Sequence, residues 1–565
     1  MAEPALQALC NAVSGPVMYG HLQEFARWIK LSGTPEELSS LKYVQARLDE
    51  WGFATKLIMH DAYISLPGKA RVTADGAALT AITHSHSQAS PAAGIAGRLV
   101  YVGDGKPSDF AGKDCRGAIV LAEGIANPAV ARQASLAGAI GQLHISPHHH
   151  LHEMCVSPVW GSPTTQTLRD MPSTVICTVS HADGTALRDR LAAGQAPAVV
   201  LHAEVDTSWR QTPILQADLL PEGAGADTPF VLLSGHHDTW FYGVMDNGSA
   251  NATMMEVARL AAQGRAMLCR GLRVCFWSGH SHGRYSGSVW YADENWDELD
   301  RLCVAHVNVD STGGTGATLL EHAAAYAELL PLAGEAIREQ TGHQYEGRRK
   351  NRSSDESFPS IGIPSMFGAL SEQPAGPVKM RNALGWWWHT PEDLIDKIDM
   401  DFLVRDTKVF VHTVGRLVAD AVLPINYSTH ARALSAELGV IAASLGGRFT
   451  LDGLLTAAGT MGTLAEAMAD RSAGADAATA ARFNAAIIAV SRALVPTDYA
   501  MGDRFTHDPA LPLPAWPVLQ PIRDLAATPA GSDAASFATV SAMRARNRMG
   551  FALREATAAL RAALA

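Results

Sequence analysis

The stretch FVLLSGHHDTWFYGVMDNGSANA, residues 230–252, decides the fold. Its first four residues form an apolar, β-compatible run, which is typical of a central strand covered on both faces. His236 and Asp238 follow at the carboxyl end of that strand, the edge of an open α/β sheet where ligands bind. The turn around Asp246 leads into an Ala- and Met-rich stretch, residues 250–262, that favours helix. This pattern predicts a metal site with His236 and Asp246 as ligands, and Asp238 as the carboxylate that orients the histidine.

Two further apolar runs also end in polar residues. Residues 272–277 run into the segment GHSHG at 279–283, and residues 304–309 run into Asp310. A later segment, WWWHTPED, places His389 in a turn. Nitrogen and oxygen donors of these kinds suit one divalent ion or two. The candidate metal ligands are His236, Asp246, Asp310 and His389.

With these motifs the sequence resembles the co-catalytic zinc aminopeptidases of the MH clan, most closely the branch that holds glutamate carboxypeptidase II and the transferrin receptor. The matching segments, in the family's order, are SGTPEELSSLKYVQARLDEWGF, GHHDTWFYGVMDNGSANATMMEVARL, FWSGHSHGRYSGSVWYADENW, NVDSTGG, SSDESFPSIGIPS and WWWHTPEDLIDKID. The resemblance implies that His236 and Asp310 hold one ion, that His389 holds the other and that Asp246 bridges them. It implies zinc, with manganese or iron as alternatives. Such a site cleaves a peptide, amide or related bond in a small molecule or peptide by polarising the carbonyl and activating water.

The chain departs from the family where two adjacent glutamates follow the second strand, because His280 and Ser281 stand there. His280 can serve as the general base, since an unperturbed imidazole has a pKa of roughly 6.5. Ser281 is a poor substitute for a carboxylate ligand, which His280 or His282 could replace, because residues two apart on an extended segment point the same way. The site is then dinuclear with an extra imidazole, mononuclear or empty. The catalytic candidates are His280, Asp238, Ser281 and His282.

Three other functions remain open. The segment GHSHG matches the G-x-S-x-G elbow of serine hydrolases, with Ser281 as the nucleophile. Loss of both glutamates is also compatible with a metal-dependent lyase that uses His280 as a proton shuttle. An inactive binding scaffold is the third possibility, and retention of the four candidate ligands argues against it.

Substrate-binding residues follow less directly. Tryptophans next to the proposed ligands can form the wall of an apolar pocket. The basic run at residues 348–352 is interpreted as a solvated loop, with recognition of a substrate carboxylate as the alternative. The histidine-rich segment PHHHLHE at 147–153 is likewise interpreted as an exposed loop, with metal binding as the alternative. The candidate substrate-binding residues are Trp240, Ser354, Asp355 and Trp388.

The predicted fold is α/β, with a mixed-sheet zinc-peptidase-like catalytic domain in two segments, residues 1–92 and 206–425. Short strands around one helix between them resemble the protease-associated domain that the related branch inserts, and we place it at 93–205. Residues 426–565 are rich in Ala, Leu and Met at helical spacing and resemble the helical dimerisation domain of that branch. A homodimer is therefore expected.

Length and charge limit the remaining possibilities. The 565 residues, 47% of them hydrophobic, suffice for several domains with ample core. A net charge of −11 disfavours nucleic acid and anionic membrane as partners. The first residues lack a signal-peptide pattern, and we see no uninterrupted apolar run of membrane-spanning length. Seven widely spaced cysteines indicate reduced thiols. These features predict a cytoplasmic protein.

Overall fold

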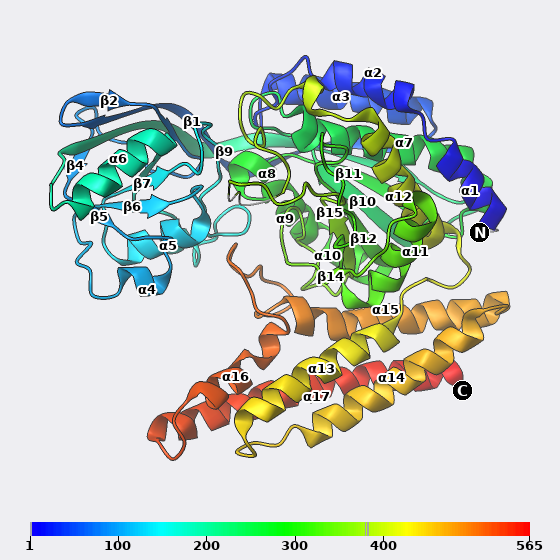
Figure 1. The fold of residues 1–565 in the computed structure, drawn as a ribbon. Helices are drawn as coiled ribbons and strands as arrows, with labels where there is room; N and C mark the ends of the chain where they lie inside the picture. The colour runs from blue at the N-terminus through cyan, green and yellow to red at the C-terminus, as the bar shows by residue number, and fades with distance from the viewer. Residues whose placement is uncertain (1–2, 379, 381–382) are drawn as a thin grey trace.

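The computed structural model describes residues 3–378, 380 and 383–565. Its chain forms three regions, which follow the colour gradient of Figure 1: a small sheet domain in blue and cyan, a central α/β domain mainly in green, and a helical domain in yellow to red. The predicted mixed α/β fold is confirmed. The identity of the small domain as a protease-associated domain stays a prediction.

The central domain is built on a ten-stranded mixed sheet. Its strand order is β14-β13-β15-β12-β10-β11-β9-β1-β2, and β4 also pairs with β9. The middle strands run parallel, so their carboxyl ends meet at one edge. The strands of this sheet are β1 (Ala54–Ala74), β2 (Ala77–Leu79), β4 (Ile95–Gly97), β9 (Val199–Leu219), β10 (Phe230–His236), β11 (Gly271–Trp277), β12 (Cys303–Val309), β13 (Ala324–Ala325), β14 (Arg348–Arg349) and β15 (Ser365–Gly368).

Helices cover both faces of this sheet, which is why β10 is buried along its whole length. Val231 and Leu233 point to one face, where they join the large core with α7, and Phe230 and Leu232 point to the other. The first face carries α1 (Glu3–Asn11), α2 (Gly15–Phe25), α3 (Pro35–Glu50), α7 (Ala250–Gln263), α11 (Leu330–Thr341) and α12 (Met400–Ala419). The second carries α9 (Ser286–Glu294) and α10 (Trp296–Leu302).

The small domain holds a second sheet, in the order β3-β8-β7-β6-β5. Two strands, β1 and β9, connect it to the central domain (Figure 1). Each is 21 residues long, and the two pair along most of their length as they extend out of the central sheet. Its elements are β3 (Ala81–Thr83), β5 (Leu99–Tyr101), α4 (Pro107–Phe110), β6 (Ile119–Glu123), α5 (Pro128–Leu136), β7 (Gly141–Ile145), β8 (Val175–Val179) and α6 (His181–Ala192).

The sequence places the start of this domain at residue 93, but the structure puts β3 in the smaller sheet, paired with β8. The domain thus begins before residue 93 and takes in the outer ends of β1 and β9, because Val72 of β1 and Leu201 and Ala203 of β9 pack in its core. Composition could not show this boundary, because β1 and β9 each belong to one domain at one end and to the other at the opposite end.

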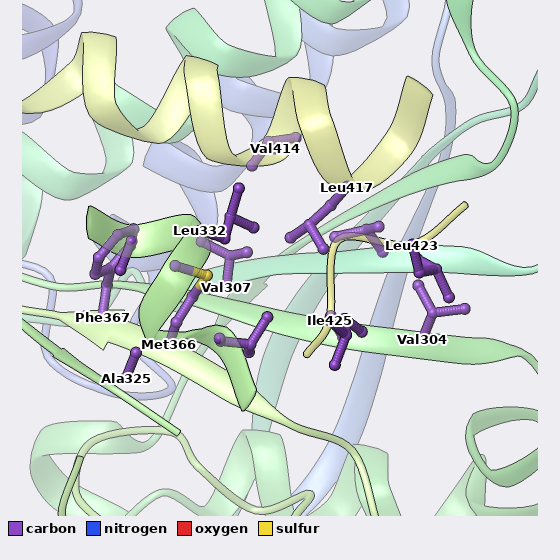
Figure 2. Close-up of a cluster of buried hydrophobic side chains, with 14 of the residues drawn as sticks. Val304, Val307, Ala325, Leu332, Met366, Phe367, Val414, Leu417, Leu423 and Ile425 are labelled. Atoms are coloured by element: carbon purple, nitrogen blue, oxygen red, sulfur yellow. The ribbon is translucent and has the colours of Figure 1, made fainter. Parts of the chain in front are cut away.

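The helical domain packs beneath the central sheet through α15 (Figure 1). Arg492 of α15 donates to the backbone carbonyls of Leu299, Asp300, Gly362 and Cys303 at 2.7–3.1 Å. The linker after α12 adds apolar contacts, as Leu423 and Ile425 lie over β12 near Val304 (Figure 2). Its helices are α13 (Tyr427–Leu445), α14 (Asp452–Ser472), α15 (Ala477–Tyr499), α16 (Gln520–Ala527) and α17 (Asp533–Leu564).

One helix of the described chain, α15, is long and apolar enough to cross a membrane by length and composition alone. In the structure 44% of its apolar window is buried. The helix also packs against α17, and Arg492 binds the central domain. The buried part of its apolar surface therefore has partners within this fold.

Candidate metal centre

The proposed ligands come from four segments that meet at the carboxyl edge of the central sheet. His236 ends β10, and Asp310 follows β12 directly. Asp246 lies in the π-helical turn η2 (Val244–Ser249) that begins the segment leading to α7, and His389 lies in the loop before α12. Because β10 and β12 are parallel neighbours, their ends bring His236 and Asp310 together.

Asp246 connects the two imidazoles. Its Oδ1 lies 3.1 Å from His236 Nε2, and its Oδ2 lies 3.1 Å from His389 Nε2. Asp310 Oδ1 lies 3.9 Å from the same His236 nitrogen. These side chains are almost wholly removed from solvent, apart from partial exposure of Asp310.

His236 Nε2 and Asp246 Oδ1 approach each other without the geometry of a hydrogen bond, and neither buried atom has another partner among the described residues. Burying polar atoms without partners costs free energy, so such atoms call for an explanation. Imidazole nitrogens and carboxylate oxygens are donors that zinc prefers, and here an imidazole faces each oxygen of Asp246. The residues present therefore fit a divalent metal ion.

The imidazoles and carboxylates at the centre shift one another's pKa. Burial alone would lower the pKa of His236, but Asp246 and Asp310 raise it well above its usual value. Burial would raise the pKa of Asp246, and the two imidazoles hold it well below its usual range. Asp246 is therefore an anion that lies between two imidazoles.

His280 begins the short helix α8 (His280–Gly283) and lies beside the proposed ligands. Its ring stacks on that of His236, with centroids 3.7 Å apart, and donor atoms of His236, His280 and Asp310 lie within 4.8 Å of one another. Buried Asp355 places its Oδ2 2.8 Å from His280 Nδ1, and its Oδ1 accepts from Ser288 Oγ. Asp355 therefore fixes the imidazole and leaves Nε2 as the available nitrogen.

Asp238 has a different role from the expected one. The backbone carbonyl of Asp238, not its carboxylate, lies 2.8 Å from His236 Nδ1. The carboxylate instead accepts from the amides of His280 and Ser281 and from Ser32 Oγ. Burial would raise the pKa of Asp238, but the nearby imidazoles of His282, His236 and His280 hold it well below its usual value. Asp238 thus anchors the start of α8 as an anion.

The other catalytic candidates lie close by without forming a triad. Ser281 lines the cavity described below, and its buried Oγ has no hydrogen-bond partner in the described part of the chain. His282 lies next to the cavity, with Nδ1 2.9 Å from Ser32 Oγ and its ring against Trp240. No described imidazole is therefore placed to take a proton from Ser281.

The centre opens into a cavity of about 1050 Å³ between the central and small domains. Three of the substrate-binding candidates, Trp240, Ser354 and Trp388, line it. Ser354 also donates to Asp310 Oδ2 at 2.8 Å, and the Trp388 ring stacks on His389 at 3.5 Å. Asp355 lies behind His280, so the structure associates it with the base and not with the cavity wall.

Sequence reasoning missed two residues that hold the ligands. Asp393 accepts from the backbone amides of Met245 and Asp246 at 2.8 and 3.0 Å, which fixes the turn that presents Asp246. The carbonyl of Glu153, from the small domain, lies 2.7 Å from His389 Nδ1. Asp393 could have been proposed from the sequence, because it lies in the segment HTPED beside His389. The contact of Glu153 is made by its backbone carbonyl, which every residue has, so the sequence could not indicate it. His237 bonds Asn251 and Ser40 away from the centre.

Comparison with known families agrees with this geometry. Residues 218–414 match the model of peptidase family M28. The resemblance to zinc metallopeptidases is thereby confirmed. The M28 segment contains all four proposed ligands together with His280 and Asp355.

Relatives extend the similarity beyond the M28 segment. The chain is 21% identical over 367 residues to a probable glutamate carboxypeptidase, AMP1, of Arabidopsis thaliana, covering 53% of this chain and 52% of that protein. It is 28% identical over 133 residues to the aminopeptidase NAALADL1 of Mus musculus, covering 22% and 17%. The chain thus spans about half the length of the first of these relatives, and less of the second.

Solved structures share the fold. An aminopeptidase from Aneurinibacillus sp. strain AM-1 aligns with a TM-score of 0.55 and 21% identity, over 73% of this chain and 95% of that one. A zinc aminopeptidase from Bacillus subtilis aligns with a TM-score of 0.56 and 19% identity, over 72% and 95%. At these identities the likeness concerns the fold.

Proposed function

We propose that the protein is a metal-dependent hydrolase that cleaves a peptide or amide bond in a small substrate. The observation that carries the proposal is the Asp246 carboxylate, which faces one imidazole with each of its oxygens at the end of a large cavity. The match to peptidase family M28 supports the same class of reaction.

We infer that His236, Asp246 and Asp310 form the better of two half-sites. His389 and Asp246 form the other half, where Ser281 stands in place of a carboxylate ligand. A divalent ion, most simply zinc, would polarise the scissile carbonyl and make water a stronger nucleophile. The half-site at His389 offers fewer anionic donors, so we expect one ion to bind more tightly than a second.

His280 is the base in this proposal. With its Nδ1 proton donated to Asp355, neutral His280 presents a lone pair on Nε2 toward the cavity. That nitrogen takes a proton from the attacking water, and Asp355 stabilises the imidazolium that forms. The proton then passes from His280 to the leaving amine.

The same imidazole favours a second candidate, a lyase on this scaffold. A histidine held by a buried aspartate can also remove a proton from carbon next to a polarised carbonyl. The two reactions differ in their products, because hydrolysis incorporates one oxygen atom from solvent. Turnover in ¹⁸O-labelled water, followed by mass spectrometry, distinguishes them.

Removal of metal tests the proposal directly. We expect the purified protein to hydrolyse members of a panel of dipeptides, N-acyl amino acids and amino-acid amides. Dialysis against a chelator should abolish that activity, and added zinc or manganese should restore it. Activity that survives complete metal removal, as measured by elemental analysis of the same sample, would contradict the proposal. Loss of that remaining activity in Ser281→Ala would support the serine hydrolase.

The cavity also indicates which substrates to include. Three of its cations have acidic partners: Arg348 pairs with Glu372, Arg349 with Asp498 and Lys350 with Glu356. Arg284 lines the cavity but has no acidic partner among the residues that the structure describes, and its Nε is buried without a hydrogen bond. Its backbone has a φ of 51°, an uncommon conformation for a residue with a side chain. We infer that Arg284 binds a carboxylate of the substrate.

Replacement of Arg284 by glutamine should therefore raise KM for a carboxylate-bearing substrate about 10- to 100-fold, with a smaller change in kcat. A hydrogen bond to a charged group contributes about 1.5–3 kcal/mol, which sets this range. The matched substrate is the same compound with its carboxylate converted to an amide. Equal losses on both substrates in steady-state kinetics would show that Arg284 does not read the carboxylate.

A further inference from the structure

Four histidines of the small domain form a cluster outside the centre described above. They lie in the loop after β7, at His148, His149, His150 and His152. Donor nitrogens of the first three lie within 4.8 Å of one another. His152 Nε2 lies 2.9 Å from His148 Nε2, so the fourth imidazole belongs to the same group.

Hydrogen bonding orients this cluster for a metal. His152 Nδ1 lies 2.5 Å from the carbonyl of Trp388, to which it donates. Such a bond to the other ring nitrogen is the usual support of a metal-binding histidine.

The loop is also held in position by its neighbours. The ring of His150 stacks on Trp386, with centroids 4.1 Å apart and planes 22° from parallel. Nitrogens that share a tetrahedral zinc ion lie about 3.4 Å apart, given zinc–nitrogen bonds of about 2.0–2.1 Å. The donor nitrogens of His148, His149 and His150 lie up to 4.8 Å apart. Because His149 is exposed, a rotation of its side chain can bring its nitrogen closer to the other two.

We propose that this loop binds a late first-row transition metal ion, separately from the catalytic centre. The donors are His148, His149 and His150, with His152 as the fourth ligand. A set made of imidazoles alone suits zinc, copper or nickel and does not suit magnesium or calcium, which require oxygen.

The site stands next to a catalytic ligand. His152 bonds the carbonyl of Trp388, and the next residue, His389, exchanges backbone contacts with Glu153: the Glu153 amide donates to the His389 carbonyl at 3.1 Å. The Glu153 carbonyl in turn accepts from His389 Nδ1. A metal ion in the loop would therefore hold the small-domain segment that orients His389.

Zinc alone is the probe for the test. The metal-stripped full chain is dialysed against zinc, and bound zinc per chain is measured by elemental analysis. To remove the catalytic centre, the comparison uses a His236→Gln/Asp246→Asn background. We expect this background to retain one equivalent, and the addition of His148→Gln and His150→Gln to remove it. The control is His322→Gln, which changes an exposed histidine elsewhere.

Two results would overturn the proposal. One is a background protein that binds no zinc, and the other is equal zinc content with and without the two loop histidines. Thermal unfolding in the absence of metal checks that the loop variants keep their fold, and the exposed His149→Gln variant should weaken zinc binding by itself. Because the measurement counts ions in a protein without its catalytic ligands, its outcome does not depend on the hydrolase activity.

Discussion

Replacement of Asp246 by alanine is expected to remove metal binding and turnover together. Its two carboxylate oxygens are the contacts that His236 and His389 share, at 3.1 Å each. Without them each half-site keeps one imidazole and at most one carboxylate. Metal chemistry contributes several kcal/mol to transition-state stabilisation, so we expect activity to fall roughly a thousandfold or more.

The measurement pairs elemental analysis with steady-state kinetics on the same preparation. Asp246→Asn keeps the shape of the side chain and removes its charge, so it should lose metal as well. Asp297→Ala is the matched control, since this aspartate is exposed on α10. If Asp246→Ala keeps its full metal content after chelation and reconstitution, the proposed ligand arrangement is wrong.

Replacement of His280 by alanine has the second largest expected effect. As the base it should contribute about 10²- to 10⁴-fold to kcat, while metal content stays as in the unchanged protein. Asp355→Asn tests the interaction between Asp355 and His280. The amide oxygen of asparagine can still accept from His280 Nδ1, but it has no charge to stabilise the imidazolium. We therefore expect an intermediate loss in Asp355→Asn and a displaced pH–rate profile.

A rescue variant makes this test sharper. The resemblance described above implies a glutamate at the position of His280, so His280→Glu should recover part of the activity lost in His280→Ala. Loss of metal in His280→Ala would instead identify His280 as a ligand, in line with its closeness to His236 and Asp310. Unchanged turnover would remove it from both roles.

The sequence was sufficient for the parts of the centre that depend on strand ends. His236 and Asp310 each follow an apolar run, and parallel neighbours must present such residues at one edge. The bridging position of Asp246 came from the family resemblance, and the structure places its oxygens between the two imidazoles. The helical nature of residues 426–565 followed from composition and spacing.

Contacts between distant segments could not be predicted in this way. The bond from His280 to Asp355 joins residues 75 positions apart, and no periodicity records it. The adjacent His237 bonds Ser40 and Asn251 on the other side of the strand, and the sequence pattern does not show these contacts. Asp238 anchors α8 because of how β10 and β11 end side by side, which requires their register.

The two long strands that carry the small domain have a mechanical consequence. A hinge made of single-chain linkers can bend freely, whereas β1 and β9 are tied to each other by a ladder that bending would have to break. The register shifts only between Pro67 and Ala70, so compliance should concentrate there. The width of the cavity between the central and small domains is therefore largely fixed by the fold. The protein would then select its ligands by the size of this cavity more than by closing around them.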